Sequence, residues 1–326
     1  MGDTVRMSRM LRTLSGLALA ALALAASPAY ARDMASDPDV ARTVSFGGSC
    51  ARCEFSGRKL MDASFMGAQF PSAILVRADL RGAKLIGSNF AGADFSRADL
   101  RGAQLVGSNF KGAIFVGASM SGLDAKAANF SGADLTGAQA MSAQISVCDF
   151  RGATMIRARF TSADLTHAVL NDVNAQDTNF ANADLVDSNL SGGHFDKANF
   201  NSADLSRATL SGGSFGGASF HSAELAGANL HGTDLVGARG LTQDQIDSAC
   251  TDSSTRLPSG LRANGCHRVA SPAAPVPPMP PMPPMPPSVQ AEVRQALAHS
   301  REAIAHASEA ARKAIEAARR RDRDDD

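Results

Sequence analysis

A strict five-residue spacing of apolar side chains is the feature that most constrains this chain. Every fifth residue from Phe55 to Leu235 is apolar, which gives 37 consecutive positions without a slip in register. Fifteen of the 16 phenylalanines lie on this register, and Phe46 is the exception. A period of five matches neither the 3.6 residues of a helical turn nor the alternation of a strand. It indicates a chain that turns a corner every five residues and points one large side chain inward on each side.

Four sides of this kind close a coil of 20 residues, and stacked coils lie about 4.8 Å apart. Residues 20 apart then become neighbours. The predicted core ladder on one side consists of Phe70, Phe90, Phe110, Phe130 and Phe150. Two residues before nearly every apolar centre stands Ala, Ser, Thr, Gly or Cys, so a small inward side chain is expected there. Phe suits such an interior because a buried Tyr hydroxyl or Trp indole would need a hydrogen-bond partner.

The repeat resembles that of the pentapeptide-repeat family, which is written A-[DN]-[LF]-x-x. The matching units are Ala78-Asp79-Leu80, Ala93-Asp94-Phe95, Ala98-Asp99-Leu100, Ala128-Asn129-Phe130, Ala163-Asp164-Leu165, Ala203-Asp204-Leu205 and Ala228-Asn229-Leu230. The resemblance covers residues 55–239. It implies an all-β solenoid, the right-handed quadrilateral β-helix of that family. The family's best-known members resemble B-form DNA in shape and charge and bind type II topoisomerases.

The charge balance argues against such mimicry. The chain carries 32 Lys and Arg against 32 Asp and Glu, and residues 55–239 carry 15 against 16, a net charge of −1. A duplex of the same length would carry about 25 negative charges. No nucleic-acid binding is expected. A binder or protector of a type II topoisomerase is kept as the alternative function, and it would require a cytoplasmic form whose N-terminal segment is not cleaved.

The first 31 residues have the pattern of a secretory signal peptide. Three arginines precede an apolar run at 14–26, and a small-x-small site ends at Ala31, where cleavage is predicted. The alternative is an uncleaved anchor helix, but the run of 13 residues is shorter than the roughly 20 that span a bilayer. The mature protein is therefore expected in the periplasm or outside the cell, without stable membrane insertion.

Both ends of the solenoid need caps, because open coils expose unpaired backbone groups. Residues 32–54 are predicted to form the N-terminal cap, and residues 240–270 the C-terminal cap. Within the latter, Thr242 and Gln245 have the spacing of a capping box, which predicts that a short helix begins there.

The cysteines fit an oxidising compartment. A Cys250–Cys266 disulfide is the preferred interpretation and would contribute about 3 kcal/mol, with two free thiols as the alternative. Cys50 and Cys53 are predicted to form a local disulfide before the first coil; a redox motif or half of a zinc site is the alternative. Cys148 occupies a small inward position, so we expect it to fill space in the core.

The C-terminal tail has three parts. Residues 271–288 form a proline-rich linker that favours an extended polyproline II spacer, with a methionine at every third position from Met279 to Met285. Docking to a proline-reading partner and capture of Cu(I) by the thioethers are the alternatives to a plain spacer. Residues 289–321 predict an Ala-rich helix, either solvated alone or packed on a partner helix. The acidic residues 322–326 are expected to be disordered.

The sequence shows no catalytic constellation, and neither cofactor nor metal is expected. Surface histidines such as His194, His221 and His231 do not share an outward column. The Asp and Asn residues before many apolar centres are expected to bind corner backbone groups. We therefore predict a non-enzymatic exported scaffold that binds an unknown protein partner through its solenoid walls or helical tail. The solenoid end and the C-terminal helix are the candidate surfaces for homo-oligomer formation.

Overall fold

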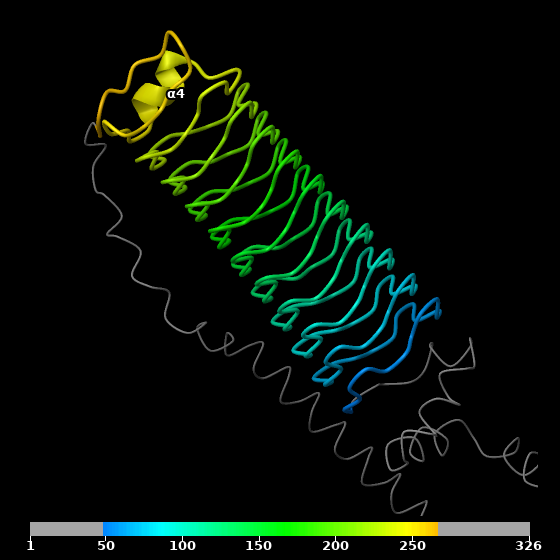
Figure 1. The fold of residues 1–326 in the computed structure, drawn as a ribbon. Coiled ribbons are helices and arrows are strands. Elements are labelled where there is room, and N and C mark those ends of the chain that lie inside the picture. The colour runs from blue at the N-terminus through cyan, green and yellow to red at the C-terminus, as the bar shows by residue number, and fades with distance from the viewer. Residues whose placement is uncertain (1–47, 267–326) are drawn as a thin grey trace, which may run out of the picture.

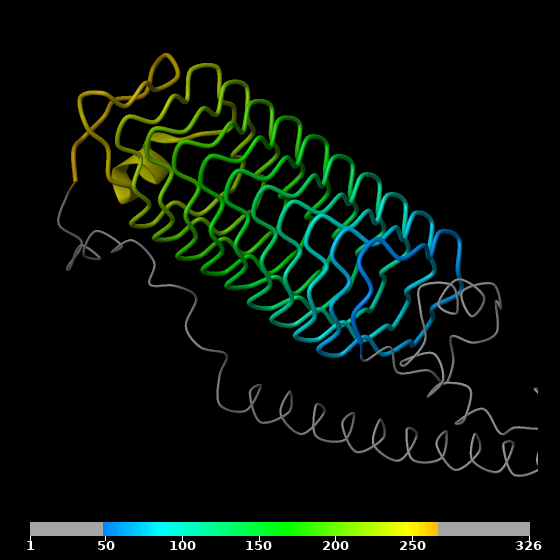
Figure 2. The ribbon, with the colours of Figure 1, turned by 60° about the horizontal axis from the view of Figure 1, so that its bottom comes forward.

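The computed structural model describes residues 48–266, which form a long four-sided solenoid with a cap at its C-terminal end (Figure 1). One residue in every five makes a parallel β-bridge to the residue 20 positions later, from Ser49↔Gln69 through to Ser219↔Arg239. Two turn residues separate successive bridges, so each side holds one bridged residue and each corner one turn. Figure 2 shows the coils stacked along one axis. The predicted coil of 20 residues is confirmed.

Each side uses its backbone donors in the same way. At one side of a central coil, the Phe110 N–H donates to the Asn129 carbonyl at 2.7 Å in the next coil, and the Asn109 N–H donates to Ser88 in the coil before at 2.9 Å. The Ala113 N–H closes the corner by donating to the Phe110 carbonyl at 3.0 Å. Because this pattern repeats around every coil, backbone pairing fixes the inward register that the apolar centres occupy.

The core is a narrow column of large and small side chains. Rings of the same wall stack one above another, with centroid separations of 5.6 Å for Phe70 and Phe90 and 5.1 Å for Phe130 and Phe150. Rings on adjacent walls meet edge to face, as Phe110 and Phe115 do at 5.5 Å. The small residues two positions earlier, such as Ala113, are buried beside them. Offset stacks and edge contacts are both favourable for aromatic rings, so the ladder is well packed.

The second residue of each corner has a positive φ. Glycine supplies many of these positions, for example Gly112 at φ 64°, but 19 residues other than glycine also adopt this conformation. Among them Val147 is β-branched, has φ 59° and is 42% exposed. The left-handed region costs an L-residue about 1–2 kcal/mol, so Val147 stores strain that the surrounding ladder holds in place.

Val147→Gly should therefore stabilise the protein by about 1 kcal/mol, because the corner conformation is unstrained for glycine. The control is Val106→Gly at the first position of a corner, whose φ is not positive. There glycine only adds freedom to the unfolded chain, and a loss of about 1 kcal/mol is expected. Urea denaturation of both variants measures the two changes, and equal shifts of the same sign would contradict the strain assignment.

The C-terminal cap replaces one side of a coil with the helix α4 (Gln243–Ser248). The predicted capping box is confirmed: Thr242 Oγ1 accepts from Gln245 N–H at 3.2 Å, and Gln245 Oε1 accepts from Thr242 N–H at 2.7 Å. Ile246 is buried on the last coil. The ladder then resumes with Asn229↔Cys250 and ends with Asp234↔Arg256, so the helix fills a gap within the stack.

Several expectations lie outside the described residues: the signal peptide, most of the N-terminal cap segment, the proline-rich linker, the Ala-rich helix and the acidic tail. Between residues 48 and 266, no helix is both long enough and apolar enough to cross a bilayer.

Candidate functional surface

The outward side chains form columns along the solenoid, with one residue per coil. Many Asp and Asn residues at the bridged positions accept a hydrogen bond from the backbone N–H two residues later, as Asp94 does from Ser96 at 2.8 Å and Asn129 from Ser131 at 2.9 Å. This confirms that these side chains serve the corner backbone. Their remaining oxygen faces outward, so the columns also present acceptors or charges at a spacing of one coil.

Arginine and aspartate pair on one wall of the N-terminal coils. Arg81 Nη2 lies 2.6 Å from Asp79 Oδ2, and Arg101 Nη2 lies 2.6 Å from Asp99 Oδ2 in the next coil. The hydrogen bond from each arginine lowers the pKa of its aspartate. These carboxylates are thereby neutralised locally, and exposed pairs of this kind contribute little to stability.

An acidic row runs along another wall of the C-terminal coils. Asp164, Asp184, Asp204 and Glu224 follow one another through successive bridges. Asp187, at the adjoining corner, pairs with Arg207 at 2.6 Å, and that hydrogen bond lowers the pKa of Asp187. The described part of the chain gives no ion pair to any of the four residues in the row, so their charges act outward.

The solenoid is neutral in sum but divided in charge. Residues 55–159 carry 12 Lys and Arg against 7 Asp and Glu, a net charge of +5, whereas residues 160–239 carry 3 against 9, a net charge of −6. Sequence reasoning missed this division because it used only the total of −1. Counting the two halves separately would have found it.

A shallow groove follows one corner of the basic half. Its lining residues are Ser56, Gly57, Val76, Arg77, Ser96, Arg97 and Val116. Arg77 and Arg97 lie one above the other at the second corner position and are exposed. Within residues 48–266 neither arginine has an ion-pair partner, so the groove combines an apolar floor with free guanidinium donors.

Comparison with known families decides what this repeat is. A model of pentapeptide repeats, present in eight copies, matches residues 49–85, 63–102, 73–112, 103–139 and 203–239, and a model of a pentapeptide repeat region matches residues 143–220. The chain belongs to the pentapeptide-repeat family. Proteins of this family form right-handed quadrilateral β-helices and are generally non-enzymatic structural or binding proteins.

Solved pentapeptide-repeat proteins share the fold. HetL from the cyanobacterium Nostoc sp. strain PCC 7120, which is involved in regulating heterocyst differentiation, is 24% identical, with a TM-score of 0.53 over 66% of this chain and 93% of HetL. QnrB1, a plasmid-mediated fluoroquinolone resistance protein, is 22% identical, with a TM-score of 0.33 over 55% of this chain and 89% of its own. A thylakoid-lumen protein from Arabidopsis thaliana is 28% identical, with a TM-score of 0.17 over 40% and 74%. No curated protein matches the sequence of this chain.

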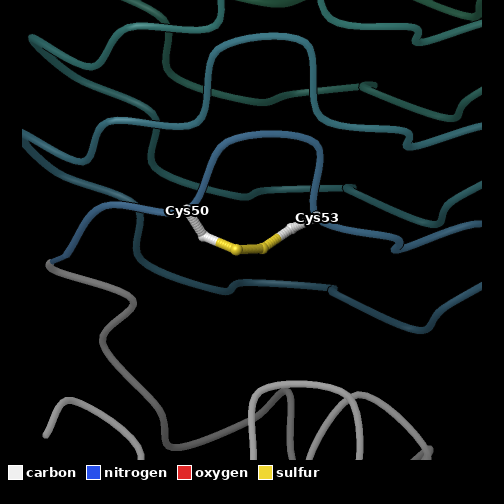
Figure 3. The surroundings of a disulfide bond; sticks show 2 residues. All are labelled: Cys50 and Cys53. Atoms are coloured by element: carbon white, nitrogen blue, oxygen red, sulfur yellow. A yellow bond between two sulfur atoms is a disulfide. The ribbon is translucent and has the colours of Figure 1, made fainter. Parts of the chain in front are cut away.

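The two cysteine pairs of this pentapeptide-repeat protein differ in the structure. Cys50 and Cys53 are joined by a disulfide across the first corner (Figure 3). The predicted Cys250–Cys266 disulfide is not formed, and both residues are free thiols. They are nonetheless neighbours, because burial and a hydrogen bond with Cys266 raise the pKa of Cys250 to about 11. The fold brings the sulfurs together, while the bond itself depends on an oxidant.

Exposure to an oxidising buffer should therefore close the Cys250–Cys266 bond. Closure removes two hydrogens, lowers the mass by about 2 Da and stabilises the cap by about 3 kcal/mol according to the loop length. Mass spectrometry after thiol alkylation checks the pairing, and Cys266→Ser serves as the control. Two alkylated cap cysteines after full oxidation would support the alternative of free thiols.

The remaining predicted residues have structural surroundings. Cys148 is buried, its Sγ donates to the Ala125 carbonyl at 2.9 Å, and burial raises its thiol pKa, so it fills space as expected. His194 lies in a bridged column between Asn174 and Ser214. His231 Nε2 lies 3.2 Å from Cys266 Sγ, a contact between cap and solenoid that sequence reasoning did not foresee. Across residues 48–266, no three His, Cys, Asp or Glu side chains form a cluster able to hold a metal ion.

Proposed function

We propose that this protein is an exported, non-enzymatic scaffold that binds a protein partner along its solenoid walls or through its helical tail. The observation that carries the proposal is the division of charge, with a net +5 on residues 55–159 and a net −6 on residues 160–239. The coils keep these charges at fixed positions, because every coil is bonded to the next through its backbone. A partner with the opposite order of charge would be held in one orientation.

Electrostatic complementarity acts mainly on association rate and orientation, and salt screens it over about 8–10 Å. The acidic row is the part of the surface best placed to contribute. Its four side chains follow the solenoid axis at intervals of about 4.8 Å, so together they span about 14 Å. A partner for this row should present a basic strand, helix or loop of matching length.

Export is tested by fractionating cells and measuring the mass of the protein. A periplasmic or secreted form that begins after Ala31 supports the scaffold. A cytoplasmic form of precursor mass would overturn export and would favour the alternative, binding of a type II topoisomerase.

Partner binding is tested by crosslinking and affinity purification from the compartment in which the protein is found. In one variant Asp164, Asp184 and Asp204 are replaced by Asn. The control variant replaces Asp94, Asp124 and Asp134 by Asn and thus removes the same charge from the basic half. Asn already stands at the bridged positions 89, 109 and 129, so both variants should fold. The proposal predicts that only the first loses the partner, by about tenfold at low salt; equal capture by both variants would contradict it.

A further inference from the structure

One corner of the solenoid alternates between apolar and polar residues from coil to coil. The column at the first corner position reads Ser56, Val76, Ser96, Val116, Thr136 and Ile156. The bridged column beside it has Ile74 and Ile114 next to the first two valines, and Asp94 and Asp134 between them. The apolar side chains therefore form rungs two coils apart, at intervals of about 9.6 Å. The groove described above contains the Val76 and Val116 rungs.

The proline-rich linker has an apolar repeat of matching length. Its methionines Met279, Met282 and Met285 are spaced by three residues and separated by prolines. In a polyproline II helix three residues advance about 9.3 Å and return to the same edge. Alternate residues of a β-strand advance only about 6.7 Å, and two turns of α-helix advance about 10.8 Å. Over three rungs the polyproline spacing departs from the solenoid spacing by less than about 1 Å in total.

We propose that the Met-Pro-Pro arm of the same molecule lies along this corner. Met279 packs on the Ile156 rung, Met282 on the Val116 rung and Met285 on the Val76 rung. The arm then runs from the C-terminal cap toward the N-terminal coils, and its prolines cover the polar rungs between.

The position of the last described residue permits this path. Cys266 lies beside His231, one corner before the Val236 corner of the proposed column. From the level of His231 to that of Ile156 is about four coils, or about 18 Å along the axis. Thirteen residues separate Cys266 from Met279 and can span up to about 45 Å. The connection is long enough to follow the wall to the adjacent corner.

The groove also offers donors that such an arm needs. A polyproline II backbone has no internal hydrogen bonds, so its carbonyls seek donors from elsewhere. Arg77 and Arg97 line the groove without ion-pair partners among residues 48–266. The Arg97 side chain extends along the corner, with its Cγ 3.7 Å from where a Cβ on Gly117 would lie. Both guanidinium groups can thus donate to carbonyls of the arm while their stems contact its prolines.

This contact goes beyond the proposed scaffold function, because it gives the protein a wall that its own tail occupies. A partner that binds this corner must displace the arm, whereas the acidic row on another wall stays accessible.

The test is methionine oxidation in the full mature chain. Dilute hydrogen peroxide converts exposed methionine to the sulfoxide, and trypsin then releases the three arm methionines in one peptide, residues 269–294. The disrupting variant carries Val76→Ser, Val116→Ser and Ile156→Thr, which copy the polar rungs of the same column. The matched control carries Met66→Ser, Ile86→Ser and Val106→Ser, which remove a similar apolar column at the opposite corner and copy Ser146 there.

A docked arm predicts that the methionines oxidise about tenfold faster in the disrupting variant than in the wild-type protein, since about nine in ten arms are covered at any moment. The control variant should oxidise at the wild-type rate. Equal rates in all three proteins would overturn the proposal. Protection that falls on tenfold dilution would also overturn it, because the arm would then lie on a second copy of the chain.

Discussion

Phe110→Asp should unfold the central coils of the solenoid. The Phe110 ring is fully buried and lies between Phe90 and Phe130, with centroid separations of 5.9 and 5.2 Å. Loss of a buried phenylalanine alone costs about 3–5 kcal/mol, and the aspartate would add an unpaired charge in a dry interior. The sum approaches the whole stability of an ordinary domain, about 5–15 kcal/mol.

The measurement is the β signal in circular dichroism with a thermal scan. Each coil contacts only its neighbours, so a break at Phe110 divides the stack into two shorter pieces. The control is Ile114→Asp, which places the same charge on the outer surface of the same coil, where Ile114 is 37% exposed. Its effect should stay within about 1 kcal/mol. An unchanged β signal in Phe110→Asp would contradict the inward register.

Gln245→Ala should open the C-terminal end of the solenoid. Gln245 Nε2 donates to the Phe220 carbonyl at 3.1 Å and to the Ala223 carbonyl at 2.7 Å, which are acceptors on the edge that α4 covers. The same side chain closes the capping box with Thr242. Leaving such groups without partners costs about 1–3 kcal/mol, and loss of the box about 1 kcal/mol, so we expect a total loss of about 3 kcal/mol.

Hydrogen exchange can locate this effect. Amides of the last two coils should exchange faster in Gln245→Ala, while those of the central coils keep their protection. Asp244→Ala is the matched control, because Asp244 is exposed, belongs to the same helical turn and should contribute less than about 1 kcal/mol. Uniformly faster exchange along the whole solenoid would contradict a local capping role.

The sequence determined the fold almost completely, for a physical reason. A core with room for one large side chain per side leaves its trace at every fifth residue, so the inward positions of Phe110 and its neighbours could be predicted from their spacing alone. The capping box at Thr242 was equally visible, because it depends on two residues at fixed spacing. In both cases the signal is local, and in the core it is also repeated.

The surface was less predictable, because outward positions are free of the packing constraint that fixes the register. The division of charge disappears in a sum over the solenoid. The meeting of His231 with Cys266 depends on how the cap folds back, which no spacing in the sequence reveals. The thiol state of Cys250 depends on the redox environment as well as on geometry.

The uniform coil also limits how the length of such a protein can change. Inserting or deleting 20 residues lengthens or shortens the solenoid and leaves every outward column in line. Inserting five residues keeps the core register intact but turns everything beyond it by one wall, so that the acidic row, for example, would face a different direction. Core stability would barely register that change, although any surface built from several coils would be cut in two. Selection on the surface columns should therefore be visible as indels in whole coils, even where the core would accept single pentapeptides.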